Sequence, residues 1–137
     1  MDEYLKLLNE NLKLLSYKKE EDILHIYCEM EKEENKKVHE RYERVVDDLP
    51  FGEFKVKLHI RARRYEKNGN NGVSDKKTEV EKLDFLNSSG RRTKRLENKM
   101  EIILQENSFS SAERLIKEVY VNISDTTLLR IFKKKKS

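Results

Sequence analysis

A strict alternation of apolar and polar side chains between residues 54 and 63 is the feature that most constrains the fold. Its apolar members are Phe54, Val56, Leu58, Ile60 and Ala62. Because successive side chains of a strand point to opposite faces, the pattern predicts a long strand with one buried face. The intervening residues are Lys55, Lys57, His59, Arg61 and Arg63. The other face of the strand is therefore basic. It either contacts nucleic acid or is the solvent-exposed side of an ordinary sheet.

Other segments upstream predict partners for this strand. Residues 40–48 lead into Pro50-Phe51-Gly52, where proline restricts φ and glycine relaxes it, so we expect a hairpin across this turn. Residues 23–30 also alternate, and Cys28 falls on the more apolar face. Residues 12–18 are expected to form a further strand, and residues 2–9 a short helix.

The period of the apolar residues changes from two to about 3.6 after Gly90, which predicts helices. The first is expected over residues 91–105. Ser110 and Glu113 have the spacing of a capping box and predict the start of a second helix. Ser124 is a good N-cap for a third helix over residues 125–132, whose inward side is expected to carry Leu128, Leu129, Ile131 and Phe132.

Together these patterns predict an α+β chain with two modules. Residues 1–86 are expected to form a small antiparallel β module, and residues 87–90 a linker. Residues 91–137 are expected to form three helices with a lysine-rich tail. The last two helices are separated by residues 120–123, which matches the helix-turn-helix pattern.

Charge is unevenly distributed along the chain. Residues 1–50 carry a net charge of −5 and residues 51–137 a net charge of +9, which together make +4 over 137 residues. A basic segment of this kind often binds an anion such as nucleic acid. The alternative is that its lysines only cover a solvent-exposed surface, which would give the same composition.

Composition also excludes several classes of protein. The sequence has neither an apolar run of the roughly 18 residues that a membrane span needs nor a cleavable leader pattern. A single cysteine, Cys28, excludes an internal disulfide and a multi-thiolate metal site. We therefore expect a cytoplasmic protein without a membrane partner and without a cofactor.

A helix-turn-helix places its second helix in the major groove of DNA. Asp125, Thr126 and Thr127 would then face base edges, with Ser124 and Arg130 in reach of phosphates or bases. Phosphate contacts are expected from basic residues in three places, namely Arg91, Arg92, Lys94 and Arg95, the run from Lys133 to residue 136, and the strand residues Lys55, Lys57, Arg61 and Arg63. The alternative is a plain three-helix bundle with a solvated basic edge.

Enzymatic activity is not expected. His25, His39 and His59 have no neighbours that resemble a catalytic triad, and Cys28 has the context of a structural cysteine. The sequence has no phosphate-binding glycine loop and no metal-ligand spacing, so we predict no metal.

An ordered series of short motifs resembles the N-terminal region of the insertion-sequence L-three transposases. The motifs are Val38 to Arg44, Asp48-Leu49-Pro50, Val56 to Ile60, Arg63-Arg64-Tyr65, Arg91-Arg92-Thr93 and Ser124 to Arg130. The resemblance implies a zinc ribbon followed by a helix-turn-helix. Transposases of this family continue into a nuclease domain with an acidic triad.

The sequence departs from this family at the positions where the resemblance implies zinc ligands. Family members carry cysteine pairs where this chain has residues 31–37 and 66–72, which contain no cysteine. We therefore expect a metal-free β module and, since the chain stops soon after Phe132, no nuclease domain.

Two hypotheses for function remain open. The chain is either a stand-alone DNA-binding protein, such as a regulator on a phage or other mobile element, or an inhibitor that binds a host defence nuclease or another host protein. The motifs at Arg91 and Ser124 favour double-stranded DNA as the partner. The acidic first half slightly favours a protein partner, and the oligomeric state stays open.

Overall fold

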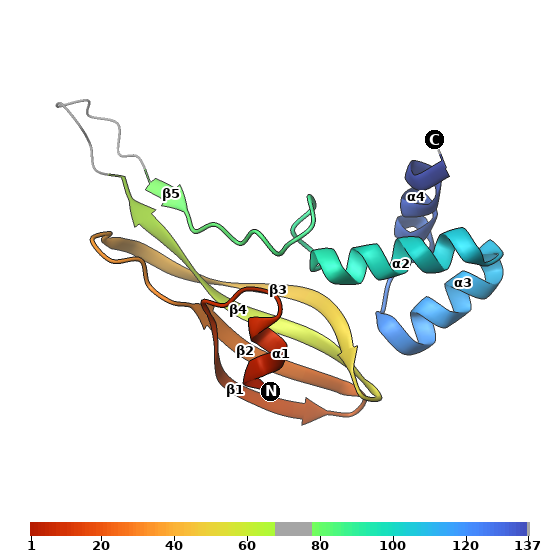
Figure 1. Cartoon of the computed structure of the whole chain (residues 1–137), viewed down its shortest axis with the longest axis horizontal. Helices are drawn as coiled ribbons and strands as arrows, with labels where there is room; N and C mark the ends of the chain where they lie inside the picture. The colour runs from red at the N-terminus through yellow and green to blue at the C-terminus, as the bar shows by residue number, and fades with distance from the viewer. Residues whose placement is uncertain (68–77, 137) are drawn as a thin grey trace.

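The structure, a computed structural model, describes residues 1–67 and 78–136, with side chains through residue 134. The asparagine- and glycine-rich residues 68–72, which predict a loop or tight turn, lie outside these ranges. The described chain is α+β (Figure 1). Its elements in order are α1 (Asp2–Lys6), β1 (Leu12–Glu20), β2 (Ile23–Met30), β3 (Val38–Phe51), β4 (Phe54–Glu66), β5 (Thr78–Val80), α2 (Lys94–Glu106), α3 (Phe109–Leu115), the π-helical turn η1 (Ile116–Tyr120) and α4 (Asp125–Lys136).

The five strands form one mixed sheet in the order β1-β2-β4-β3, with β5 paired to β4. The predicted hairpin across the Pro50 turn is confirmed, because β3 and β4 pair antiparallel from Phe51↔Phe54 to Val38↔Tyr65. The expectation of a wholly antiparallel module is wrong, since β2 and β4 pair in parallel. Strands β2 and β4 are the inner strands of this order, and β1 and β3 lie at its two ends. The chain leaves β2 and reaches β4 through residues 31–37 and β3, and this long connection is what a parallel pair requires.

One face of the sheet carries a hydrophobic core. Its centre consists of Ile26, Cys28, Leu58 and Ile60, none of which is exposed to solvent, and Leu5 of α1 packs against them. Burial also raises the pKa of the Cys28 thiol to about 12. Cys28 therefore lies on the inner face of its strand, as predicted, and is a neutral thiol at physiological pH.

The opposite face of the sheet is not uniformly solvated. Arg63 is only 4% exposed, although the alternation of β4 places it on the predicted basic face. Its guanidinium donates to the carbonyl oxygen of Met30 at 2.7 Å and to the carboxylates of Glu29 and Glu81. Tyr65 donates to the same Glu81 carboxylate at 3.2 Å. Arg63 is thus corrected from a solvent-facing cation to the centre of a buried polar cluster.

The helices that follow β5 gather at one end of the sheet and have their own core (Figure 1). This second core is formed mainly by Leu96, Met100, Leu104, Ala112, Ile116 and Leu128, all at most 1% exposed. Leu129, expected on the inward side of the last helix, is 40% exposed instead. Within the described ranges, none of the helices has the length and apolarity to cross a membrane.

Hydroxyl side chains cap the three longer helical segments. Thr93 caps α2 by accepting a hydrogen bond from the Leu96 amide, so residues 91 and 92, which were predicted to belong to this helix, lie before its start. Ser124 accepts from the amide of Thr127, as the sequence predicted for α4. The predicted capping box at Ser110 is wrong, because α3 begins at Phe109 and Ser108 accepts from the Ser111 amide.

A buried carboxylate joins the two modules. Asp48 of β3 is fully buried and accepts from the Thr93 hydroxyl at 2.6 Å and from two nitrogens of Arg95, at 2.9 and 2.6 Å. The amide and carbonyl of the neighbouring Asp47 bond to the carbonyl of Arg91 and the amide of Thr93, both at 3.0 Å. The segment before α2 therefore continues the sheet beyond β3, which sets the orientation of the helices.

Candidate nucleic-acid interface

A cleft of about 570 Å³ lies where the start of α4 faces the segment that leads into α2. Five of the residues predicted to bind DNA line it, although they come from two distant parts of the sequence. They are Arg91, Arg92, Ser124, Thr127 and Arg130, and Asp47, Ser89, Asn122 and Ile123 complete the lining. We call this feature the junction cleft.

The N-terminus of α4 forms one wall of the junction cleft. Besides capping the helix, Ser124 donates its hydroxyl proton to Oγ1 of Thr127 at 2.9 Å, which leaves the Thr127 hydroxyl able to donate outward. The free amide groups at the start of this twelve-residue helix add a partial positive charge. This end of the cleft therefore favours anions.

The positive charge in the junction cleft is not cancelled by its acidic neighbours. Within the described structure, the side chains of Arg91 and Arg130 have no hydrogen-bond or ion-pair partner, whereas Arg92 is held by Glu97 at 2.6 Å. Asp47 is already paired with Lys57 at 2.9 Å, and Asp125 at the start of α4 is paired with Lys117. The guanidinium groups of Arg91 and Arg130 are thus available to bind an anion from solution.

The outward face of α4 continues from the junction cleft. Thr126, Leu129, Arg130 and Lys133 are all exposed and recur at the three- and four-residue spacing of one helix face. Leu129 was not among the residues predicted to bind DNA, because its apolar character placed it in the core. Its side chain is suited to contact a thymine methyl group in a major groove.

Several other predicted residues serve the fold instead of the cleft. Arg95 is held by Asp48, whose hydrogen bond and charge raise the pKa of Arg95 although burial opposes this. Lys55 donates to the carbonyl of Lys117 at 2.5 Å and to the Asn122 side chain at 2.7 Å, so it ties β4 to the helices. Lys94 is exposed but lines a different hollow beside α2. Arg95 and Lys55 are therefore corrected to internal contacts.

Arg61 is exposed and lies elsewhere, over the middle of the sheet. It lines a second hollow together with Arg41 of β3, a residue not predicted to bind DNA. The signal that sequence reasoning lacked is the register Arg41↔Arg63 and Glu43↔Arg61, which makes Arg41 and Arg61 diagonal neighbours on one face.

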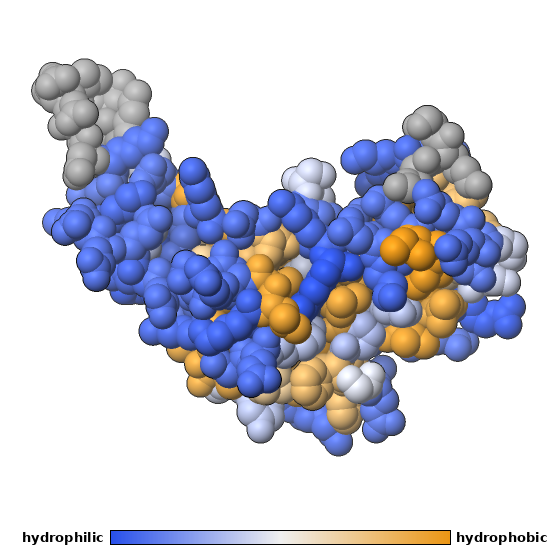
Figure 2. All heavy atoms as spheres, viewed as in Figure 1, coloured by the Kyte–Doolittle hydropathy of each residue, from blue (hydrophilic) through white to orange (hydrophobic). Residues whose placement is uncertain are grey.

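Hydrophilic residues cover most of the face of the molecule seen in Figure 2, with apolar atoms showing in patches over the middle and over the helices. The residues that line the junction cleft are polar or charged, apart from the partly buried Ile123. Such a lining suits a polar or anionic ligand more than an apolar one.

One segment of the chain matches a known protein family. Residues 27–66 match the family model described as the zinc-finger of transposase IS204/IS1001/IS1096/IS1165, and the matched segment covers β3, β4 and the second half of β2. This match supports an origin in the N-terminal region of a transposase. Neither the curated proteins nor the solved structures include a significant match to the chain.

The residues present do not fit the zinc ion that this family description implies. The only cysteine, Cys28, is buried in the core with its pKa raised by burial. Among the described residues, no group of three or more His, Cys, Asp or Glu side chains could hold a metal ion. Zinc therefore has no part in the function proposed for this chain.

Proposed function

We propose that this chain is a non-catalytic DNA-binding protein derived from the N-terminal region of a transposase. In this proposal α3, η1 and α4 act as a helix-turn-helix, with α4 as the recognition helix in the major groove. The observation that carries the proposal is the convergence of Arg91, Ser124, Thr127 and Arg130 on the junction cleft. The family match to residues 27–66 supports it independently.

Each part of the cleft has a role in this mechanism. A phosphate of the DNA backbone binds between Arg91 and the N-terminus of α4, where guanidinium and amide groups donate to its oxygens. That contact fixes the register of α4 on the duplex. Thr126, Leu129 and Arg130 on the outward face then meet base edges, and an arginine there is suited to the O6 and N7 acceptors of guanine.

The first experiment asks whether the protein selects a sequence. Purified full chain is incubated with a pool of random duplexes, bound DNA is enriched over several rounds, and the enriched site is measured by anisotropy at a series of salt concentrations. We expect an enriched motif and an affinity that falls steeply with salt, because phosphate contacts release counterions. Salt-dependent binding without enrichment would reject the recognition helix and leave only polycation behaviour.

The second experiment removes single contacts. Arg130→Ala is expected to weaken specific binding about 5- to 150-fold, since a good base contact contributes roughly 1–3 kcal/mol. Thr127→Ala removes a hydroxyl donor from the cleft and is expected to weaken binding by a smaller factor. Lys99→Ala is the control, because Lys99 of α2 lies outside the proposed helix-turn-helix, is also exposed and has no partner within the described structure. Equal affinity for all of these variants would contradict the assignment of α4.

A further outcome separates this proposal from the inhibitor hypothesis. The chain is used as bait in host lysate that has been treated with nuclease. Under the proposal, captured proteins are lost with the DNA. A nuclease subunit retained in equal stoichiometry would favour an inhibitor, and Arg130→Ala would then test whether the same cleft binds it.

A further inference from the structure

The unpartnered arginines of the chain are concentrated at two places. Within the described structure, five arginines hold carboxylate or carbonyl partners: Arg44, Arg63, Arg64, Arg92 and Arg95. Five do not: Arg91 and Arg130 at the junction cleft, Arg41 and Arg61 at the hollow over the sheet, and Arg114. The hollow over the sheet therefore resembles the junction cleft in having two arginine side chains without a hydrogen-bond or ion-pair partner among the described residues.

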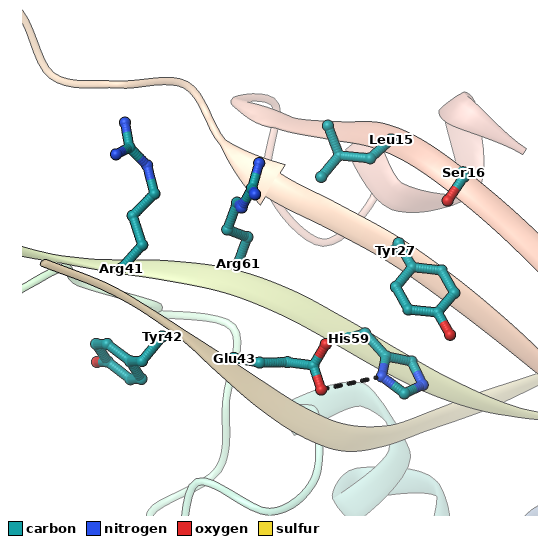
Figure 3. Close-up of a pocket in the computed structure, with 8 residues that line it drawn as sticks. All are labelled: Leu15, Ser16, Tyr27, Arg41, Tyr42, Glu43, His59 and Arg61. Carbon is teal, nitrogen blue, oxygen red and sulfur yellow. Dashed lines mark ion pairs between the residues drawn. The ribbon is translucent and has the colours of Figure 1, made fainter.

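The hollow lies on the face of the sheet opposite the core and has a volume of about 490 Å³. Four strands contribute to it, with Leu15 and Ser16 from β1, Tyr27 from β2, His59 and Arg61 from β4, and Arg41, Tyr42 and Glu43 from β3. Figure 3 shows Arg41 and Arg61 extending to the same side of the sheet. We call this feature the sheet hollow.

An aromatic platform forms the floor of the sheet hollow beside the two arginines. The rings of Tyr27 and His59 are stacked, with their centroids 4.4 Å apart and their planes at 24° (Figure 3). Nδ1 of His25 lies 2.8 Å from Nε2 of His59 and holds the second ring from the side. Tyr27 and His59 are partly exposed, so part of the platform is accessible to solvent.

One buried polar atom at the sheet hollow also lacks a hydrogen bond. Nδ1 of His59 is buried and makes no hydrogen bond to any described residue, and the Glu43 carboxylate lies 3.5 Å from it, within ion-pair distance when the imidazole is protonated. Glu43 is also the one acidic side chain that lines the hollow. Its carboxylate is directed to His59 (Figure 3), and neither Arg41 nor Arg61 forms an ion pair with it.

We propose that the sheet hollow binds a single-stranded nucleic-acid segment. Arg41 and Arg61 donate to successive phosphates, and a base stacks on the Tyr27–His59 platform. Stacking on aromatic side chains beside a cationic track is the general means by which proteins hold single strands without reading their sequence. An acidic peptide would use the two arginines but not the rings.

This site is separate from the junction cleft. Arg41 lies six residues along β3 from Asp47, which lines the cleft, so the two are about 20 Å apart at the rise of an extended strand. The proposal does not depend on the recognition helix, and each site has variants that leave the other untouched.

The test measures binding of a fluorescein-labelled oligothymidylate of about 12 nucleotides to the full chain by anisotropy. Arg41→Ala with Arg61→Ala is expected to weaken binding about tenfold or more. Arg114→Ala with Lys99→Ala removes two exposed charges elsewhere and is expected to have a much smaller effect. Both arginines of the hollow are exposed, so circular dichroism should show an unchanged fold.

A second pair of measurements isolates stacking from charge. Tyr27→Leu keeps an apolar strand residue but removes the ring, and is expected to weaken oligothymidylate binding by about tenfold. The same variant should bind an abasic strand of equal length as the wild type does. Equal loss on both strands would overturn the stacking role.

Duplex binding is measured in parallel so that the two proposals can fail separately. The sheet-hollow variant should keep wild-type affinity for the selected duplex, whereas Arg91→Ala with Arg130→Ala should lose the duplex and keep the single strand. The proposal is overturned if the oligothymidylate does not bind, if the control pair weakens it equally, or if polyglutamate of matched charge binds the hollow as tightly.

Discussion

The carboxylate of Asp48 shows how one residue can hold two modules together. It is fully buried, and its oxygens accept from Thr93 and twice from Arg95. The Arg95 guanidinium also lies 4.4 Å from the centre of the Tyr4 ring. Burial and the nearby charge of Asp48 together raise the pKa of Tyr4, so this phenol stays neutral and donates to the carbonyl of Leu49. One carboxylate thus links α1, β3 and α2.

We predict that Asp48→Asn lowers the free energy of unfolding by about 3 kcal/mol, because it leaves the half-buried Arg95 without its charged partner. Urea unfolding followed by circular dichroism measures this change. Glu10→Gln, at an exposed position in the turn before β1, serves as the control and should change stability little. A loss below about 1 kcal/mol would show that the pair contributes no more than a surface ion pair does.

The outcome at individual residues shows where sequence reasoning succeeds. The cap at Ser124 was predictable, since capping depends only on residues three positions apart. The same rule failed at Ser110, because packing decides where α3 begins: starting the helix at Phe109 lets that ring contact Phe132 edge-on, with centroids 5.3 Å apart. Arg63 could not be predicted either, since its partners Glu29 and Glu81 come from other strands and segments.

At the level of elements, the histidine pair between β2 and β4 depends on their parallel register. Tyr27↔His59 and His25↔Lys57 are the paired positions, so the two imidazoles meet on the open face of the sheet. Burial and the neighbouring His59 lower the pKa of His25 from its ordinary value of 6.5. Glu20, at 3.7 Å, opposes this shift, whereas Lys18 and Lys57 reinforce it.

The lowered pKa predicts a loss of stability in mild acid. Below pH 6.5 the unfolded chain protonates His25 while the folded chain resists it, so the free energy of unfolding falls as the pH drops. Above that pH His25 is neutral in both states and contributes no pH dependence. Urea midpoints at about pH 8, 6.5 and 5 measure the trend.

His25→Gln tests the assignment, since glutamine does not titrate. This variant is expected to lose stability less steeply than the wild type below pH 6.5. His39→Gln, at an exposed position on β3, is the control and should retain the wild-type slope. If both variants follow the wild-type curve, other groups cause the acid sensitivity.

The strands themselves were largely predictable, whereas their arrangement was not. Period-two alternation located β2 and β4 and the Pro50 turn located the hairpin, because these signals are local. Which strands become neighbours depends on contacts across the whole sheet. The parallel pairing of β2 with β4, and hence the sheet hollow, therefore had no signal in the sequence.

At the scale of the whole molecule, the turn at residues 87–90 connects the two cores. Gly90 has a φ of +71°, and its carbonyl accepts a hydrogen bond from the Arg44 guanidinium at 2.8 Å. A Cβ at this position would lie 2.3 Å from the same Arg44 nitrogen. The turn thus requires glycine for its conformation and for its contact with β3.

Comparison of two glycine variants separates these requirements. Gly52, in the β3–β4 turn, has a φ of +61°, but a Cβ added there would have no atom within 4 Å. Gly52→Ala is therefore expected to cost about 1 kcal/mol of stability from conformation alone. Gly90→Ala should cost about 2 kcal/mol, because Arg44 must also move. Thermal and urea unfolding measure both, and equal losses would show that the Arg44 contact contributes nothing.

The bonds of Asp48, the backbone pairing of Asp47 and the reach of Lys55 to the helices have a joint consequence for recognition. They hold α4 at a set angle to the sheet before any partner arrives, so association requires no hinge closure and sacrifices little conformational entropy. Diffusional encounter and electrostatic steering should then limit the rate of complex formation. That rate should fall as solvent viscosity or salt concentration rises, and no slower step from rearrangement of the protein should follow.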